Sequence, residues 1–419
     1  MNIPTASTPD ANAIFDPIMD HSEERLANPY PVLEQMRQSG GSVIFSPRGN
    51  QWLVLGYEEA NSILRSKDFG KRLLENWKPP NVFLRGAMRM LRRKQGSSML
   101  IQDPPDHTRL RSLVNSAFTP GVIHGLEGHI EEIANDLIDK MQERFKSEKE
   151  IDLISAFAFQ LPVIVIAELL GVPTEHREKF KKWSNDITLA FSGSVNPIRM
   201  AKSYVSMLNL RLFLRLVIAE KRRNPKKDLI SALVAAQSED NDRLSNDELL
   251  ANTVLILIAG HETTVNLISN SVFNLLQHPE QLAKIQSDPE LIPNAVEEVL
   301  RFDPPVQIIR RLAKKETELG GMRIKENDIL TVVTAACNRD PKIVNEPDVF
   351  NIEREHIKHL TFGAGIHYCL GAELARTEGR IAIKILFDRI RDLSLSDRQR
   401  TYKGPFSLRG FKELYVSRK

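Results

Sequence analysis

The chain has 419 residues, of which 42% are hydrophobic and 26% charged, and its formal net charge is +3. This balance excludes a disordered or fibrous chain, and the small net charge gives no indication of nucleic-acid binding. Two cysteines, Cys337 and Cys369, argue against a disulfide framework, and we expect Cys337 to be a core residue. Residues 1–29 carry no signal-peptide pattern and no apolar run reaches the roughly 18 residues of a membrane span, so we expect a cytoplasmic protein.

Helical periodicity and capping residues predict a mainly α chain with a minor β portion. No linker interrupts it, so we expect one domain over residues 1–419, with residues 1–25 poorly ordered. The expected helices span 55–66, 107–117, 126–146, 155–170, 175–190, 198–223, 228–237, 245–277, 280–286, 291–302 and 370–391. The expected strands span 42–45, 52–55, 318–324, 329–334 and 413–417.

A first polar motif follows Pro104-Pro105 in the segment 103–111. Asp106 is positioned to cap the helix that follows. His107 and Arg111 are four residues apart, which places both on one helix face. From the residues alone this face is either solvated or a site for an anionic group.

The longest expected helix is polar at its centre. Ser245-Asn246-Asp247-Glu248 forms a capping box, and the helix continues to Pro279. The segment 254–259 is apolar on every side, which predicts complete burial. Gly260 and Glu262 follow at once, although a helical glycine costs about 1 kcal/mol and a buried carboxylate costs several. This pattern indicates either a hydrogen-bonded core cluster or a buried reaction site, with His261 as a satisfied helix residue.

Two basic motifs lie in the following third of the chain. Glu298 and Arg301 are three residues apart on one helix face, a spacing that suits an ion pair. Further on, the segment 305–311 ends in the adjacent pair Arg310 and Arg311.

Cys369 lies in the loop Phe362-Gly363-Ala364-Gly365-Ile366-His367-Tyr368-Cys369-Leu370-Gly371. Its glycines permit positive φ, and a helix beginning near Leu370 would aim free N–H groups at the sulfur and favour the thiolate. The residues leave three interpretations open: a packing cysteine, a nucleophile with His367 as base, or a metal ligand.

In this order, the motifs resemble those of the cytochromes P450, and of the soluble bacterial type. The resemblance implies a P450 fold, with haem b buried between the long central helix and the Cys-bearing loop. Cys369 would then be the axial ligand of the haem iron. On the loop, the residues around the haem would be Phe362, Gly363, His367 and Gly371. The propionates would be bound by His107, Arg111 and Arg311, with His359 as a weaker partner. On the long helix, Ala259 and Gly260 would lie beside the haem. Glu262 and Thr263 would deliver protons to dioxygen, while Glu298, Arg301 and Arg354 would form a structural triad.

The implied activity is that of a monooxygenase that inserts one atom of O₂ into a small apolar substrate such as a fatty acid, steroid, terpenoid or polyketide-like molecule. Met88, Val306, Ile308 and Leu408 would line the substrate pocket, and the basic segment 85–94 would attract anionic substrates. No flavin- or nicotinamide-binding segment is present, so electrons would come from a separate ferredoxin or flavodoxin with an NAD(P)H-dependent reductase, docked through basic residues such as Arg109. A peroxide-driven peroxygenase and a non-catalytic haem sensor are the alternatives.

Overall fold

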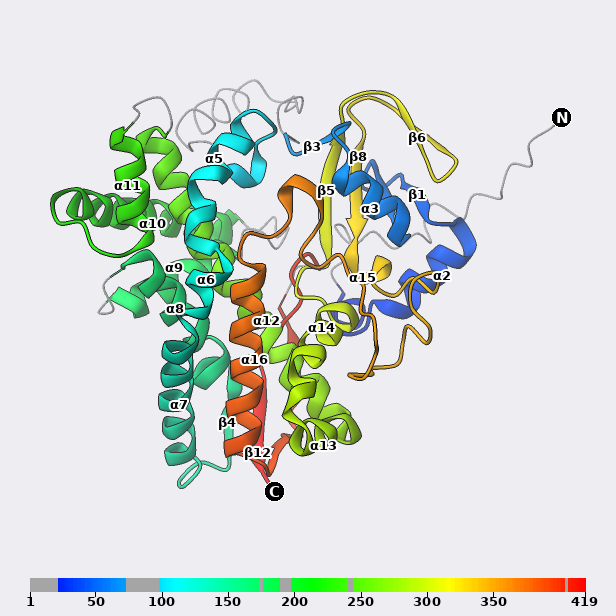
Figure 1. Ribbon diagram of the computed structural model, residues 1–419. Helices are drawn as coiled ribbons and strands as arrows, with labels where there is room; N and C mark the ends of the chain where they lie inside the picture. Colours follow the sequence, from blue (N-terminus) through cyan, green and yellow to red (C-terminus); the bar gives the residue numbers. More distant parts are fainter. Residues whose placement is uncertain (1–21, 73–97, 173–175, 189–196, 240–243, 404–405) are drawn as a thin grey trace. The chain divides into compact units, whose positions relative to one another are not determined.

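The computed structural model describes residues 22–72, 98–172, 176–188, 197–239, 244–403 and 406–419. Figure 1 shows its helices and strands. The chain divides into two compact units. The first unit comprises residues 1–70, 131–158 and 263–419, and the second comprises residues 71–130 and 159–262. Two long helices, α7 (Glu127–Arg144) and α12 (Asn246–Gln277), each pass from one unit into the other.

The first unit combines short helices with all of the strands found among the described residues. Its helices are α1 (Glu23–Ala27), α2 (Tyr30–Gly40), α3 (Tyr57–Arg65), α13 (Pro279–Ser287), α14 (Ile292–Phe302), α15 (Thr334–Cys337) and α16 (Ala372–Arg389). Its strands are β1 (Val43–Ser46), β2 (Gln51–Val54), β3 (Phe69–Gly70), β4 (Glu150–Asp152), β5 (Ile308–Ala313), β6 (Thr317–Leu319), β7 (Met322–Ile324), β8 (Ile329–Val333), β9 (Leu393–Leu395), β10 (Thr401–Tyr402), β11 (Phe411–Glu413) and β12 (Tyr415–Arg418).

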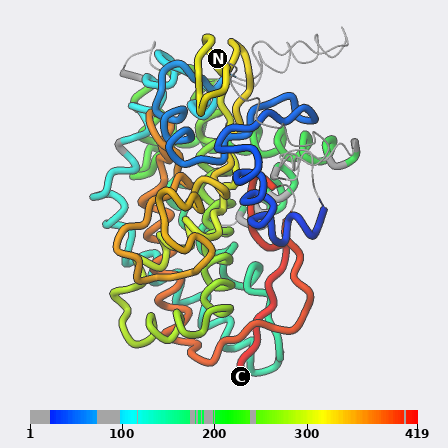
Figure 2. The backbone as a smooth tube through the Cα atoms, turned by 90° about the vertical axis from the view of Figure 1, so that its right-hand side faces the viewer, coloured from blue at the N-terminus to red at the C-terminus, as the bar shows by residue number. Residues whose placement is uncertain are grey.

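The largest sheet has the strand order β1-β2-β8-β5-β3. The β2–β8 pair is parallel and the other neighbouring pairs are antiparallel. The smaller sheets are β4-β12-β9, β6-β7 and β10-β11. Figure 2 shows the C-terminal strand β12 (red) running beside β4, with Val416 opposite Ile151.

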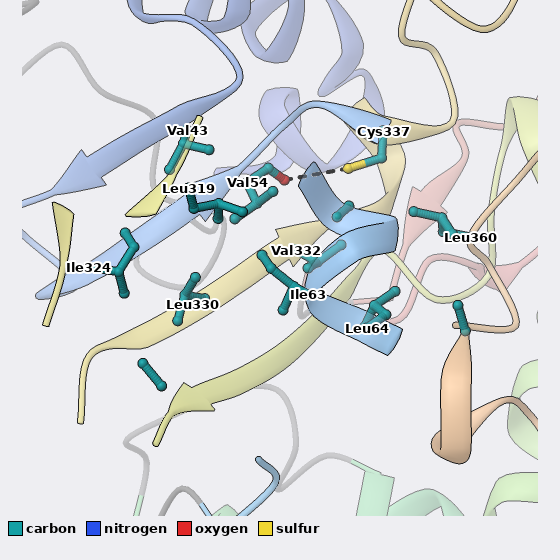
Figure 3. Packing of buried hydrophobic residues seen from close by; sticks show 13 residues of the cluster. Val43, Val54, Ile63, Leu64, Leu319, Ile324, Leu330, Val332, Cys337 and Leu360 are labelled. Atoms are coloured by element: carbon teal, nitrogen blue, oxygen red, sulfur yellow. Dashed lines mark hydrogen bonds between the residues drawn. The ribbon is translucent and has the colours of Figure 1, made fainter. Parts of the chain in front are cut away.

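One face of the large sheet carries an apolar core that α3 covers (Figure 3). Leu330 and Val332 of β8 pack there with Ile63 and Leu64 of α3, and all four side chains are buried. Cys337 is fully buried in the same cluster, and its thiol donates to the Val54 carbonyl oxygen at 3.5 Å. The prediction that Cys337 is a core residue is therefore confirmed, and burial raises the pKa of its thiol.

The described residues of the second unit form helices and the segments that connect them, without a strand. Its helices are α5 (Asp106–Asn115), α6 (Pro120–His124), α8 (Gln160–Leu170), α9 (Arg177–Thr188), α10 (Pro197–Arg223) and α11 (Leu229–Glu239). Helices α9 and α10 pack against each other, and α11 packs beside α10. No helix in the described part of the chain is long and apolar enough to cross a membrane.

The predicted fold class, mainly α with a minor β portion, is confirmed, whereas several element boundaries are wrong. The strand expected at 318–324 is the β6–β7 hairpin, which turns at Gly320 and Gly321 with φ of 56° and 76°. The helix expected from 155 begins at Gln160, because a π-helical turn occupies Ile154–Ala158. Helix α2 was not expected, although Val32, Leu33 and Met36 form its buried apolar face.

A buried carboxylate lies in the middle of α16. Glu378 is 1% exposed, and its Oε2 has no hydrogen-bond partner among the described residues. It shares the buried face of the helix with Leu374, Ile381 and Ile385. Burial raises the pKa of Glu378 well above its ordinary value near 4.5.

Replacing Glu378 by glutamine should therefore stabilise the protein increasingly as pH rises. Below the carboxyl's pKa in the unfolded chain, both states are protonated and the residue makes no pH-dependent difference. Above that pKa, the carboxyl ionises in the unfolded chain but stays protonated in the native state. The free energy of unfolding of the wild type therefore falls, relative to that of Glu378→Gln, by up to about 1.4 kcal/mol per pH unit. Urea unfolding at pH 5, 6 and 7 measures this difference.

Glu373→Gln is the matched control, because Glu373 lies on the same helix, is only partly buried and pairs with Arg380 at 3.6 Å. The difference in free energy of unfolding between Glu373→Gln and the wild type should stay nearly constant from pH 5 to pH 7. An equally constant difference for Glu378→Gln would contradict the argument.

Candidate functional site

The Cys-bearing loop has a backbone that two glycines make possible. Gly363 and Gly365 both have φ of 70°. A Cβ on Gly365 would lie 2.4 Å from the Leu64 carbonyl oxygen, so a side chain there would collide with the end of α3. The loop closes through the Cys369 N–H, which donates to the Phe362 carbonyl oxygen at 2.8 Å, and leaves Cys369 exposed.

The helix after the loop starts later than the sequence indicated. Helix α16 begins at Ala372, with Gly371 as its N-cap residue, rather than near Leu370. The favourable field of a helix N-terminus falls off within its first turn. Cys369 therefore lies three positions before the first helical residue, at the outer limit of that field.

The Phe362 ring is held by a cluster that sequence reasoning missed. The Arg376 guanidinium lies 4.6 Å from the ring centroid, and the His359 ring centroid lies 5.7 Å from it. Glu297 of α14 accepts from Arg376 Nε at 2.6 Å and pairs with His359 Nε2 at 3.0 Å. Burial would raise the pKa of Glu297, but the bonds from His359 and Arg376 outweigh it and hold the pKa at about 2.

His359, the weaker candidate for a propionate partner, belongs to this cluster. Its Nε2 is bonded to Glu297, and its Nδ1 accepts from the Thr361 N–H at 3.3 Å. Both ring nitrogens are thus hydrogen-bonded within the cluster, which holds the loop in place.

The start of the loop is tied to the end of α14 through Asn338. The Leu360 N–H donates to Asn338 Oδ1 at 2.7 Å, and Asn338 Nδ2 donates to Thr361 Oγ1 at 2.9 Å. Asn338 and Thr361 both donate to the Leu300 carbonyl oxygen of α14. Residues 360 and 361 therefore enter the loop in a fixed position.

Glu298, Arg301 and Arg354 meet in the structure. Arg301 forms a bidentate pair with the Glu298 carboxylate at 2.7 and 2.8 Å, and both side chains are fully buried. Arg354 Nε donates to the same carboxylate at 3.1 Å. Arg301 and Arg354 also donate to backbone carbonyls within 345–349, so the three residues fix the chain that leads toward the cysteine.

Strand β5 places the adjacent arginines Arg310 and Arg311 on opposite faces, and Arg311 is the one expected at a propionate. Ile309 and Arg311 share one face of the strand, and Ile308 and Arg310 share the other. A Cβ on Gly363 would lie 3.6 Å from Ile309, so the face with Arg311 is turned toward the Cys-bearing loop. Arg311 is 2% exposed, and its Nη1 donates to the Arg310 carbonyl oxygen at 3.1 Å.

The expected pocket residues lie on the other side of this strand or outside the described residues. Val306 pairs with Leu408 in an isolated bridge, and both are half-buried. Ile308 packs against the apolar cluster formed with α2. Ile309 was not singled out from the sequence, yet it is the residue on the loop's side. Met88 and the basic segment 85–94 lie outside the described residues.

Helix α12 begins with the predicted capping box. The Glu248 N–H donates to Ser245 Oγ at 3.2 Å, and the Ser245 N–H donates to Glu248 Oε2 at 2.9 Å. The expectation of complete burial over 254–259 is wrong at Ala259, which is exposed, and at Leu255 and Ile258, which are partly exposed. Gly260 faces Ile166, which a Cβ would approach within 2.9 Å.

The polar centre of α12 divides between two environments. His261 is fully buried, with Nδ1 bonded to the Leu257 carbonyl oxygen at 2.8 Å and Nε2 to Ser184 at 2.6 Å, so the prediction of a satisfied helix residue is confirmed. Glu262 is 3% exposed and lies 3.9 Å from His261 Nε2. Thr263 is partly exposed, one helical turn after Ala259, whereas Thr264 is buried.

The motif on α5 differs from expectation in one respect. Asp106 is the first residue of the helix rather than its cap, and its carboxylate pairs with Arg72 at 3.1 Å and Arg109 at 3.5 Å. Arg109 also pairs with Glu248 at 2.5 Å. His107 is buried and Arg111 is partly exposed.

Comparisons with known proteins identify the chain's relatives. The cytochrome P450 family model matches residues 48–405. The biotin biosynthesis cytochrome P450 of Bacillus subtilis (strain 168) is 37% identical over 94% of this chain and 98% of its own. The cytochrome P450 monooxygenase PikC of Streptomyces venezuelae is 39% identical over 88% of this chain and 85% of its own.

A solved structure has the same fold. It is P450BioI in complex with an acyl carrier protein ligated to hexadec-9Z-enoic acid, at a TM-score of 0.85 and 36% identity. The match covers 94% of this chain and all of that one. The extent of these matches establishes what the motif order indicated: the chain belongs to the cytochrome P450 family and is a haem- and iron-binding monooxygenase.

Proposed function

We propose that the protein is a haem-thiolate monooxygenase in which Cys369 holds the iron and an acyl chain is the substrate. The observation that carries the first part is the exposed Cys369 on a loop whose glycine backbone and bracing hydrogen bonds fix its position. A sulfur donor held this way fits the one protein ligand that a haem-thiolate iron requires. When bound, haem b supplies the activation of O₂ and the transfer of one oxygen atom to the substrate.

The residues of α12 would leave room for O₂ on one side of the haem and deliver protons to it. Ala259 has a small side chain and would leave room for a diatomic molecule beside the helix, whereas the missing side chain of Gly260 lets Ile166 pack closely against it. The Thr263 hydroxyl, partly exposed one turn away, would hold a water molecule by a hydrogen bond and pass on its proton. Glu262, at 3% exposure, would take up a proton from the solvent side and deliver it toward Thr263.

The basic residues would hold the haem carboxylates. Arg311 lies on the β5 face turned toward the Cys-bearing loop, and a guanidinium binds a carboxylate through two parallel hydrogen bonds. His107, Arg111 and His367 would complete this set. Phe362, Gly363 and Gly371 would shape the loop around the ligand sulfur.

Electrons would come from a separate ferredoxin or flavodoxin with its NAD(P)H-dependent reductase. Arg109 is a weaker docking residue than the sequence suggested, because Glu248 and Asp106 already neutralise it. The single-domain organisation over residues 1–419 stays a prediction.

An acyl substrate is favoured over a steroid, terpenoid or macrolide. On α12, Leu255 and Ile258 are partly exposed and Ala259 is exposed, and these apolar side chains suit a hydrocarbon chain. A relative with nearly complete coverage is named for biotin biosynthesis, and the solved P450BioI structure contains a fatty acyl group on its carrier protein. The basic segment 85–94 would attract the carboxylate end of such a chain.

Replacing Cys369 by serine should abolish the reduced-CO absorption band of thiolate-ligated haem. Serine cannot supply the thiolate that produces this band, while the loop would keep its backbone. Difference spectra of the reduced, CO-treated protein measure the effect, with Cys337→Ser as the control that must keep the band. A band of full height in Cys369→Ser would remove Cys369 from the ligand position.

Replacing Thr263 by alanine should uncouple electron use from product formation. Without the hydroxyl, proton delivery is impaired, and product formed per NAD(P)H consumed should fall by about tenfold or more. Thr264→Ala is the matched control, since the neighbouring Thr264 is buried and is the weaker candidate for proton transfer. Equal coupling in the wild type and Thr263→Ala would exclude Thr263 from this role.

A C16 fatty acid should bind more tightly than its methyl ester, and more tightly than a steroid of similar carbon count. The ester keeps the apolar chain but loses the charge, so we expect a rise in the dissociation constant of about tenfold, or roughly 1.4 kcal/mol. The low-to-high-spin shift of the ferric Soret band reports binding. Equal affinities for acid and ester would reject anionic selection, and tighter steroid binding would reject the acyl class.

A further inference from the structure

Helix α10 carries large apolar side chains on both of its faces. Leu210, Leu214, Val217 and Ile218 are buried on the inner face, where α10 packs against α9 and α11. A helix that is apolar all round is normally buried on every side. The outer face of α10 is nevertheless exposed.

The exposed side chains form one continuous row. Met200, Tyr204, Leu208, Leu212 and Leu216 follow each other at intervals of four residues and are 56%, 52%, 42%, 57% and 71% exposed. Val205 lies beside the row and is 53% exposed. Single exposed apolar residues are common on protein surfaces, but a contiguous patch of this length marks an interaction site. We refer to these six residues as the α10 ridge.

Two cations beside the α10 ridge pair with carboxylates of the same unit, and the partly buried Arg211 interacts with one of these carboxylates, Asp247. Lys202 Nζ pairs with Asp186 Oδ1 at 2.7 Å, and Arg215 Nη2 lies 3.8 Å from Asp247 Oδ1. An anionic membrane or an acidic protein would need uncompensated cations beside the apolar row. The flanks therefore favour a partner that is itself apolar and nearly neutral.

We propose that the α10 ridge is the interface of a homodimer, in which it packs against the same ridge of a second copy. Side chains at i±4n spacing form ridges that fit the grooves of another helix, and two such helices cross at about −50°. A two-fold axis requires both helices to present the same type of ridge, and the α10 ridge meets that condition. The crossing point would lie near Leu208, the middle residue of the row.

The test compares the holoenzyme with a variant whose ridge is charged. Leu208→Asp with Leu212→Asp should raise the dimer dissociation constant by at least about tenfold in sedimentation equilibrium, because each copy then buries two carboxylates. Met322→Asp is the control, since Met322 is 37% exposed on the β6–β7 hairpin of the other unit and should leave the dimer unchanged. An unchanged Soret spectrum in both proteins verifies that the fold is intact.

A cross-linking experiment locates the two-fold axis independently. Leu208→Cys should form an intermolecular disulfide on mild oxidation, since residues at a helix crossing bring their Cα atoms within disulfide range. Asn209→Cys, exposed one position further along α10, should not. A wild type that is monomeric at every concentration overturns the proposal, as does a dimer that survives the charged ridge. Monomers that bind phosphatidylcholine vesicles through the ridge would also overturn it and assign the face to a membrane.

Discussion

Two neighbouring glutamates on α14 hold the loop that carries Cys369. Glu298 forms a fully buried pair with Arg301 and also binds the partly exposed Arg354, and this network fixes the chain at 345–349. Glu297, the preceding residue, binds Arg376 and His359, which both lie beside the Phe362 ring. Because Glu297 and Glu298 are consecutive residues of one helix, α14 fixes the positions of both carboxylates relative to each other. Losing one partner of a buried ion pair costs about 3–5 kcal/mol, so the loop depends strongly on α14.

The consequence of this bracing is a cysteine whose place is set before any ligand binds. The Leu360–Thr361 entry is tied to Asn338 and α14, and Gly365 rests against the Leu64 carbonyl of α3. A ligand atom fixed by its surroundings loses little conformational entropy on binding. Nothing in this scaffold selects a substrate, which would be chosen by α12 and β5.

The sequence predicted well those features that depend on local spacing. The capping box of Ser245 and Glu248 defines the start of α12, and the three-residue spacing of Glu298 and Arg301 gives their ion pair. Contacts between distant segments escaped it. Glu297 meets Arg376 across 79 residues and His359 across 62, a pairing that no local pattern encodes.

Other differences arise from local detail that sequence patterns resolve poorly. Glu378 had a visible signal, because it occupies a position on an apolar helical stripe with Leu374 and Ile381. The starts of α5 and α16 each differ from expectation by one or two residues, which is the usual uncertainty of a helix end. The exposure of Ala259 was also unexpected, because an apolar run does not reveal which of its residues borders open space.

The central claim is that the braced loop exists to present the Cys369 sulfur to a haem iron. Iron K-edge X-ray absorption of the ferric holoenzyme tests it most directly, because the fine structure distinguishes sulfur from nitrogen and oxygen neighbours of the iron. We predict one sulfur ligand in the wild type and in Cys337→Ser, and none in Cys369→Ser. A wild-type iron surrounded only by nitrogen and oxygen, or a sulfur that persists without Cys369, would contradict it.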